Sequence, residues 1–236
     1  MNADPALIED LVVANRILAA QGIVDGFGHV SARHDEFPDR YLLARSMAPA
    51  LVTADDIMEF DLDGKPFEPR DRAVYLERFI HGEIYRARPD VKAVVHSHSP
   101  SVIPFGVTGI GLKPVYHMSG FLGAGVPVFE IRDAAGDGTD MLISSMKLGA
   151  ALAKSLGAAT VALMRGHGDV VVGTSVMQVV YRAIYTEMNA KLELEARSLG
   201  AITYLSAREG AAAAAINDRV MGRAWELWKR AALEGM

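Results

Sequence analysis

Cysteine is absent from the 236 residues of this chain. Disulfide bonds and thiolate metal ligands are therefore excluded, and imidazole and carboxylate groups remain as the ligands that the sequence offers to a metal. Long apolar runs are also missing, since no stretch approaches the roughly 18 uninterrupted apolar residues that a membrane-spanning helix needs. The N-terminus shows no basic region followed by an apolar run. These absences predict a cytoplasmic protein with no membrane partner.

An excess of charge of one sign is lacking as well. Lys and Arg number 24 against 29 Asp and Glu, which gives a formal net charge of -5, and the two signs are interspersed along the chain. This balance gives no electrostatic reason to expect a nucleic-acid partner. A small-molecule substrate is the expected partner instead. The length and the apolar fraction of 50% suit one domain, predicted to span residues 1–236.

The hydrophobic pattern predicts an α/β fold. Tight turns, such as the one expected at Asp61-Leu62-Asp63-Gly64, join several neighbouring strands without a crossover helix. We therefore expect a three-layer α/β/α sandwich with a central, largely antiparallel sheet. Strands are predicted at 29–33, 41–44, 91–95, 126–131, 160–164 and 170–172, and helices from Pro5 to before Gly22, at 71–88, 145–156 and 174–200, and after a capping box of Ser206 and Glu209.

Three histidines are the candidate metal ligands. His96 and His98 stand two apart at the end of a predicted strand, so their imidazoles point to the same side. His167 lies between Gly166 and Gly168 in a turn between two apolar strands, where the glycines permit a tight backbone and a close approach to a neighbouring segment. Three nitrogens without a fourth protein ligand would leave coordination positions open for substrate or water, as in a catalytic site.

Glu77 is the candidate catalytic carboxylate. It lies on the predicted helix that precedes the strand of His96, and that helix could aim one carboxylate at the metal. As a general acid or base it would need a pKa raised by burial. Its spacing of four residues from His81 equally fits an ion pair on a solvated helix face, so spacing alone leaves both interpretations open.

In these residues the chain resembles the class II aldolase/adducin superfamily over nearly its whole length. The resemblance implies that His96, His98 and His167 bind a divalent metal and that Glu77 is catalytic. It also implies an α/β/α sandwich that commonly forms a homotetramer with active sites at subunit interfaces. The motifs that carry it are Gly28-His29-Val30-Ser31-Ala32-Arg33, Asp61-Leu62-Asp63-Gly64, Glu77 before His81, Tyr85 to Val91, Ala93 to His98, and Arg165-Gly166-His167-Gly168.

The chain departs from the sugar-phosphate enzymes of this family at its phosphate-binding positions. Those enzymes typically have Gly-Asn at Gly28-His29, Thr-Gly near Arg45-Ser46 and Ser-Ser at Tyr75-Leu76. A phosphate needs small donors and glycine amides, which the bulky Tyr75 and Leu76 do not provide. A phosphorylated sugar is therefore not the expected substrate.

Arg45, Ser46 and His29 are the predicted substrate-binding residues. The Arg45 guanidinium suits a carboxylate, and the other two add neutral donors. The segment from Leu43 to Pro49 resembles the family's decarboxylase branch, which includes dihydroxyphthalate-type and 3-hydroxy-2-methylpyridine-4,5-dicarboxylate 4-decarboxylase-like enzymes. His117 stands about where the aldolases carry a proton-donating tyrosine, so Glu77 and His117 are the two candidate proton carriers.

The resulting prediction is a metal-dependent carbon–carbon lyase. It would decarboxylate a hydroxylated aromatic, heteroaromatic or dienoic dicarboxylic acid through a metal-stabilised enolate or phenolate, as part of aromatic compound catabolism. Mn²⁺ and Zn²⁺ are the favoured cations, with Fe²⁺ and Co²⁺ as further candidates. Three alternatives stay open: an aldolase for a non-phosphorylated hydroxy-carbonyl substrate, a non-haem iron oxygenase for an aromatic acid, and a non-catalytic binding module like the adducin head domain.

Overall fold

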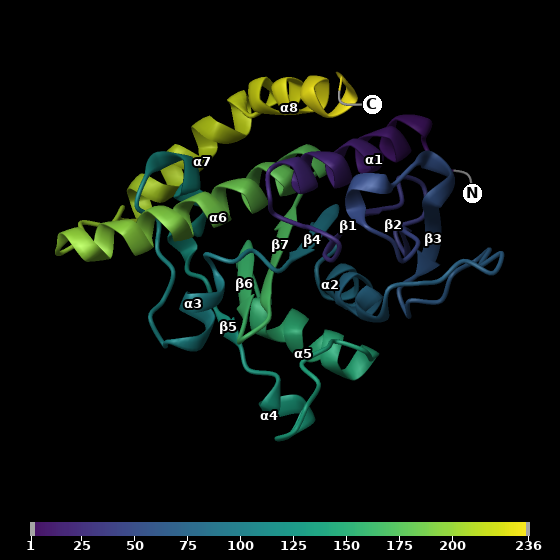
Figure 1. Ribbon diagram of the computed structural model, residues 1–236, viewed down its shortest axis with the longest axis horizontal. Coiled ribbons are helices and arrows are strands. Elements are labelled where there is room, and N and C mark those ends of the chain that lie inside the picture. The colour runs from purple at the N-terminus through teal and green to yellow at the C-terminus, as the bar shows by residue number, and fades with distance from the viewer. Residues whose placement is uncertain (1–2, 235–236) are drawn as a thin grey trace.

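A central sheet of seven strands organises the computed structural model, which describes residues 3–234 (Figure 1). The strands lie in the order β3-β2-β1-β4-β7-β6-β5, and every neighbouring pair is antiparallel except β5 and β6. The predicted largely antiparallel sheet is therefore confirmed. The strands are β1 (His29–Arg33), β2 (Arg40–Ala44), β3 (Ile57–Asp61), β4 (Ala93–Ser97), β5 (Val128–Phe129), β6 (Val161–Met164) and β7 (Gly168–Gly173).

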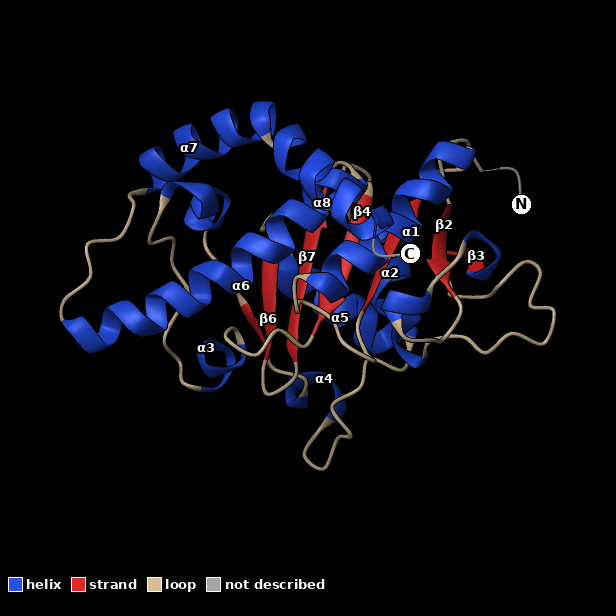
Figure 2. Ribbon diagram, turned by 45° about the horizontal axis from the view of Figure 1, so that its top comes forward, coloured by secondary structure: helices blue, strands red, loops and turns tan. Residues whose placement is uncertain are grey.

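Helices cover both faces of this sheet and complete the three predicted layers. α1 and α6 cover one face, with α8 outside them, and α2 and α5 pack together on the other (Figures 1 and 2). The helices are α1 (Pro5–Ala20), α2 (Phe79–Ala87), α3 (Ile103–Val107), α4 (Arg132–Ala135), α5 (Met146–Leu156), α6 (Val176–Leu199), α7 (Ala207–Val220) and α8 (Gly222–Glu234), and the 3-10 helices are η1 (Pro49–Leu51), η2 (Ala54–Asp56), η3 (Leu76–Arg78) and η4 (His117–Ala124).

Each face of the sheet has its own apolar core. Successive side chains of a strand point to opposite faces, so Val94 joins the core under α2 and α5 while Val95 joins the core under α1 and α6. Leu42 and Leu43 of β2 divide in the same way. Each fully buried side chain of this size contributes about 1.5–3 kcal/mol to folding. The central strands are thus fixed from both sides, which gives the site residues on β4 and β7 a rigid base.

Most predicted helix boundaries are close to those in the structure. Asp4 caps α1 by accepting a hydrogen bond from the amide of Ala6 at 2.9 Å, with Pro5 as the first helical residue. Ser206 and Glu209 form the predicted capping box at the start of α7. The alanine-rich end of the chain is divided, however, into α7 and α8.

Three predicted elements differ from the structure. The helix predicted at 71–88 begins only at Leu76, as η3 followed by α2, because Arg70 and Asp71 have positive φ angles of 43° and 58° that no right-handed helix contains. The strand predicted at 126–131 shrinks to Val128–Phe129 at the edge of the sheet. The turn at residues 61–64 was expected to join two strands. After this turn the structure has only a single bridge, between Phe60 and Pro66, in place of the second of these strands.

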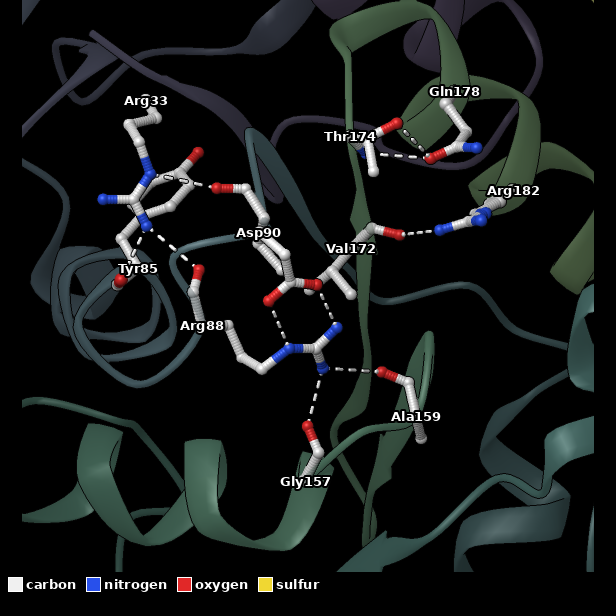
Figure 3. A network of polar contacts seen from close by, with 11 residues as sticks. Arg33, Tyr85, Arg88, Asp90, Gly157, Ala159, Val172, Thr174, Gln178 and Arg182 are labelled. Atoms are coloured by element: carbon white, nitrogen blue, oxygen red, sulfur yellow. Dashed lines mark hydrogen bonds and ion pairs between the residues drawn. The ribbon is translucent and has the colours of Figure 1, made fainter. Parts of the chain in front are cut away.

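The buried Arg33 and the partly exposed Arg88 tie α2 to the sheet (Figure 3). The Arg33 side chain on β1 donates hydrogen bonds to four backbone oxygens, among them those of Tyr85 at 2.6 Å and Arg88 at 3.0 Å at the end of α2. Arg88 forms a bidentate ion pair with Asp90 and also donates to the carbonyl of Gly157 at 2.6 Å. These contacts fix the position of α2 relative to β1 and β4.

Within residues 3–234, no helix combines the length and hydropathy that a membrane crossing requires. The single domain predicted over 1–236 stays a prediction, and its ends, residues 1, 2, 235 and 236, lie outside the described residues.

Candidate metal centre and active-site pocket

The three predicted metal ligands meet where β4 and β7 pair. His96 lies in β4 opposite Val170 of β7, and His98 follows directly after β4 ends. His167 lies in the turn between β6 and β7, and its amide donates a hydrogen bond to the carbonyl of Met164 at 3.0 Å. Strand β4 extends two residues further than predicted, so His96 is held within the ladder.

Two glycines allow His167 to approach the end of β4. Gly166 has a φ angle of 66°, a left-handed conformation that favours glycine. At Gly168 a Cβ atom would lie 1.9 Å from the carbonyl oxygen of Ser97, far inside van der Waals contact. Only a glycine at position 168 lets the two strands come this close, which is the role the sequence predicted for it.

The histidine side chains turn their Nε2 atoms toward one point. Nδ1 of His96 donates a hydrogen bond to the carbonyl of Asp169 at 3.0 Å, and Nδ1 of His167 donates to the carbonyl of Met141 at 3.0 Å. Both bonds place the ring proton on Nδ1 and leave Nε2 as a lone pair. The Nε2 atoms of His98 and His167 lie 3.0 Å apart.

A divalent cation fits this arrangement. Nε2 of His96 is buried and has no hydrogen-bond partner among the described residues, which is costly unless a ligand occupies the position. One oxygen of Glu77 joins the three Nε2 atoms, and all four candidate ligand atoms lie within 4.8 Å of one another. Imidazole with one carboxylate is a ligand set used by zinc, manganese, iron and cobalt.

Glu77 lies at a kink within η3, where its own backbone angles, φ -90° and ψ 16°, are non-helical. Its Oε1 accepts a hydrogen bond from the amide of Ile143 at 2.9 Å. Its Oε2 lies 3.4 Å from Nε2 of His96 and 3.5 Å from Nε2 of His167. The Glu77 carboxylate is therefore positioned as a fourth candidate ligand, which the sequence did not predict.

The pKa values of Glu77 and His98 favour cation binding, whereas Glu77 outweighs burial and raises the pKa of His96, so a cation there would compete with a proton. Burial alone would raise the pKa of Glu77, but His167 and His96 outweigh it and hold that pKa below its usual range, so the raised value predicted from the sequence is wrong. Burial lowers the pKa of His98 to about 4, with the neighbouring His96 adding to the effect. At neutral pH the structure thus offers a carboxylate and a neutral His98.

A buried polar cluster behind the ligands escaped the sequence prediction. Oγ of Ser97 donates a hydrogen bond to the carboxylate of Asp169 at 2.5 Å and lies 2.9 Å from Oγ of Ser99. Asp169 also supplies the backbone oxygen that orients His96. Two signals in the sequence could have indicated this cluster. Asp169 directly follows Gly166-His167-Gly168, and Ser97 lies between His96 and His98.

A pocket of about 310 Å³ opens in front of the metal centre. His29 and Ser46, two predicted substrate-binding residues, line it together with Glu77 and His98. Most of the remaining lining is apolar and was not predicted. It comprises Gly26, Phe27, Gly28, Met47, Ala48, Tyr75, Leu76 and Leu142.

The other two predicted site residues lie outside this pocket lining. Nε of Arg45 donates a hydrogen bond to the carboxylate of Asp56 at 2.6 Å, although the adjacent Ser46 reaches the pocket. His117 lies exposed in η4, where its backbone oxygen accepts a hydrogen bond from the Asn217 side chain at 2.8 Å. Roles for Arg45 and His117 therefore stay predictions.

Comparison with known proteins shows which family this chain matches. Residues 9–194 match the class II aldolase and adducin N-terminal domain. The chain belongs to this family.

Relatives within the class II aldolase and adducin family extend the comparison. The chain is 39% identical to the decarboxylase tropJ of Talaromyces stipitatus, over 91% of this chain and 89% of the relative. It is 33% identical to the 3,4-dihydroxyphthalate decarboxylase of Arthrobacter keyseri, over 81% and 79% of the two chains. An aldolase II superfamily protein from Pseudomonas syringae has the same fold, with a TM-score of 0.79, 20% identity and coverage of 99% and 96%. These relatives confirm the prediction of a lyase, with a carboxy-lyase favoured over an aldehyde-lyase.

Proposed function

We propose that this protein is a metal-dependent decarboxylase of a hydroxylated aromatic, heteroaromatic or dienoic dicarboxylic acid. The observation that carries the proposal is the cluster of three histidine Nε2 atoms and one Glu77 oxygen beside a mainly apolar pocket. The names of the relatives, decarboxylase tropJ and 3,4-dihydroxyphthalate decarboxylase, both support the reaction, and the second also supports the substrate class.

The pocket lining suits a planar carbon skeleton. Phe27, Leu76 and Leu142 present apolar surface, and a volume of about 310 Å³ leaves room for one substituted ring. Tyr75 fills part of the family's phosphate-binding region and turns its hydroxyl to the carbonyl of Met47 at 2.5 Å. That hydroxyl is therefore engaged with the backbone, in keeping with a substrate that carries no phosphate.

Polar groups at the pocket would hold the acidic ends of the substrate. His29 and Ser46 offer neutral donors from the lining. Arg45 uses Nε for Asp56, which leaves its two Nη groups without another partner among the described residues and able to bind a second carboxylate. A divalent cation on His96, His98 and His167 would supply positive charge to the substrate oxygen that becomes negative when the carbon–carbon bond breaks.

Glu77 is suited to carry the proton. Glu77 is ionised at neutral pH, and its Oε2 faces the histidine cluster where the substrate hydroxyl would lie, so it is placed to accept the proton of that hydroxyl. Glu77 then delivers this proton to the ring carbon that carries the carboxylate, and the electron pair of the oxygen forms a carbonyl bond. Cleavage of the carbon–carbon bond releases carbon dioxide, and its electron pair restores the ring and leaves the oxygen negative. This phenolate regains a proton from water as the product leaves. His117, exposed and outside the pocket lining, would serve only from a neighbouring subunit of the expected tetramer.

The test combines metal analysis with a panel of ortho-hydroxy aromatic dicarboxylates, each assayed for released carbon dioxide. We expect Mn²⁺ or Zn²⁺ in the purified protein and carbon dioxide from at least one acid. Formation of an aldehyde from a non-phosphorylated substrate would replace the proposal with an aldolase. Oxygen consumption with an aromatic acid would replace it with an iron oxygenase, and a protein that binds no metal would resemble the adducin head domain.

Glu77→Gln tests the proton carrier. We expect loss of turnover while the three histidines still hold the metal, because the amide keeps the shape of the side chain but cannot accept the proton. Glu83→Gln is the matched control, since Glu83 is also a buried glutamate of this region but pairs with Arg86 outside the site. Substantial turnover by Glu77→Gln would exclude Glu77 and point to His117. A cytoplasmic location, a tetramer and a role in aromatic compound catabolism stay predictions.

A further inference from the structure

A buried chain of four polar side chains runs from the core to the active-site pocket. His29 and Ser31 stand two apart on β1 and share one face of the sheet, while His81 and Tyr85 stand four apart and share one face of α2. Nδ1 of His29 lies 2.7 Å from Nε2 of His81, Nδ1 of His81 lies 2.6 Å from Oγ of Ser31, and that oxygen lies 2.8 Å from the Tyr85 hydroxyl. Ser31, His81 and Tyr85 are at most 1% exposed.

Only one direction of hydrogen bonding gives an acceptor to every donor among these four side chains. The Tyr85 hydroxyl donates to Ser31, Ser31 donates to Nδ1 of His81, and Nε2–H of His81 donates to Nδ1 of His29. The remaining ring proton of His29 then lies on Nε2. In the opposite direction the Tyr85 hydroxyl would be a buried donor without an acceptor among the described residues, at a cost of about 1–3 kcal/mol.

Two ionisation properties support this direction. Burial raises the pKa of Tyr85, so its hydroxyl keeps the proton that starts the chain. Burial lowers the pKa of His81 to about 3, so its ring carries one proton and can donate at one nitrogen only. The backbone amide of Val94 also interacts with the Tyr85 oxygen as a donor, which leaves the hydroxyl proton free for Ser31.

We propose that Tyr85, Ser31 and His81 are positioning residues that hold His29 as the neutral tautomer with its proton on Nε2, aimed at an anionic oxygen of the substrate. This inference rests on the proposed function for its ligand, the carboxylate of a hydroxylated acid. It also separates His29 from the metal ligands. The rings of His29 and His96 lie 5.1 Å apart, but a nitrogen that carries a proton cannot coordinate a cation.

The direct test is nitrogen NMR of the zinc-loaded protein with ¹⁵N-labelled histidine. The His29 signals are identified by their disappearance in His29→Gln. We expect the chemical shift of a bare nitrogen at Nδ1 and that of a protonated nitrogen at Nε2. A proton on Nδ1 of His29 in the wild-type protein would overturn the inference.

A matched pair of variants tests the control by His81. His81→Gln retains a donor for Nδ1 of His29 and should keep the wild-type shifts, whereas His81→Leu has no donor and should give shifts averaged between the two tautomers. Both variants should retain zinc, which shows that the site is folded. Wild-type shifts in His81→Leu would show that His29 needs no partner and would refute the positioning role.

Salicylate, an ortho-hydroxybenzoate, probes the contact with substrate. We expect it to shift the Nε2 proton of His29 in the wild-type protein and to bind on the order of 10-fold more weakly to His81→Leu than to His81→Gln, since a hydrogen bond to a charged group is lost. An unchanged Nε2 proton would exclude the contact. A fixed tautomer in a protein that releases no carbon dioxide would refute the proposed function alone, and carbon dioxide release with the proton on Nδ1 would refute the positioning role alone.

Discussion

Gly168→Ala is expected to damage the metal centre although the residue contributes no ligand. The added Cβ would lie 1.9 Å from the carbonyl oxygen of Ser97, where such carbon–oxygen contacts normally lie at about 3.3 Å or more, so the two strands must separate by about 1.4 Å. His167 directly precedes Gly168 and His98 follows Ser97. Their Nε2 atoms, 3.0 Å apart, would move relative to each other by far more than the roughly 0.2 Å that metal coordination tolerates.

The expected effects are a loss of metal affinity and a loss of stability. Changes to groups that support metal ligands cost about 10- to 100-fold in affinity, and a strand displacement of this size should reach at least that range. Overpacking costs about 1–3 kcal/mol in free energy of unfolding. Affinity is measured by calorimetric titration of the metal-free protein, and stability by urea unfolding with a chelator present.

Gly106→Ala is the matched control. Gly106 is also buried, in α3, but a Cβ atom there would lie 3.5 Å from its nearest neighbour, the carbonyl oxygen of Met164, which is ordinary contact. Its metal affinity should equal that of the wild-type protein. Wild-type affinity and an unchanged unfolding midpoint in Gly168→Ala would refute the argument that close strand contact sets the ligand geometry.

Three further predictions concern the cation, pH and the arginine network. A cation at 100 times its dissociation constant should add about 2.7 kcal/mol to the free energy of unfolding. In scanning calorimetry, a chelator should therefore lower the thermal midpoint of the wild-type protein but not that of His98→Ala. Burial raises the pKa of Asp169 to about 6 against a hydrogen bond from Ser97 that lowers it. The folded pKa of Asp169 exceeds its unfolded value, so the stabilisation by the protonated group is complete below about pH 4 and is lost as the pH rises through about 6. In urea unfolding, the metal-free wild-type protein should lose about 3 kcal/mol over that pH window relative to Asp169→Asn. Arg33→Met should cost at least about 3 kcal/mol, because four backbone oxygens lose a charged donor, and an unfolding midpoint within error of wild type would contradict this.

The boundaries of strands and helices were predicted correctly only where local residue patterns set them. Apolar runs located β2 and β6 nearly to the residue, because these strands are buried on both faces, and alternation located β1. The start of α2 was predicted too early, because the helical spacing of apolar residues extends into residues 71–75. The positive φ angles of Arg70 and Asp71 belong to the preceding loop, and this spacing does not reveal them. The short edge strand β5 was overextended for a related reason: pairing with β6, not residue type, sets where it ends.

The candidate metal ligands could be predicted from the sequence. The spacing of His96 and His98, the glycines around His167, the absence of cysteine and the family resemblance predicted the candidate donor set, and the structure brings these three side chains together with Glu77. Tertiary structure decided the rest. It turned Glu77 into a candidate ligand with a lowered pKa, placed Asp169 behind the histidines and joined His29 to Tyr85 through Ser31 and His81. These properties depend on residues up to 90 apart in the chain, such as Glu77 and His167, and on the burial that their packing creates, so no local pattern of residues could encode them.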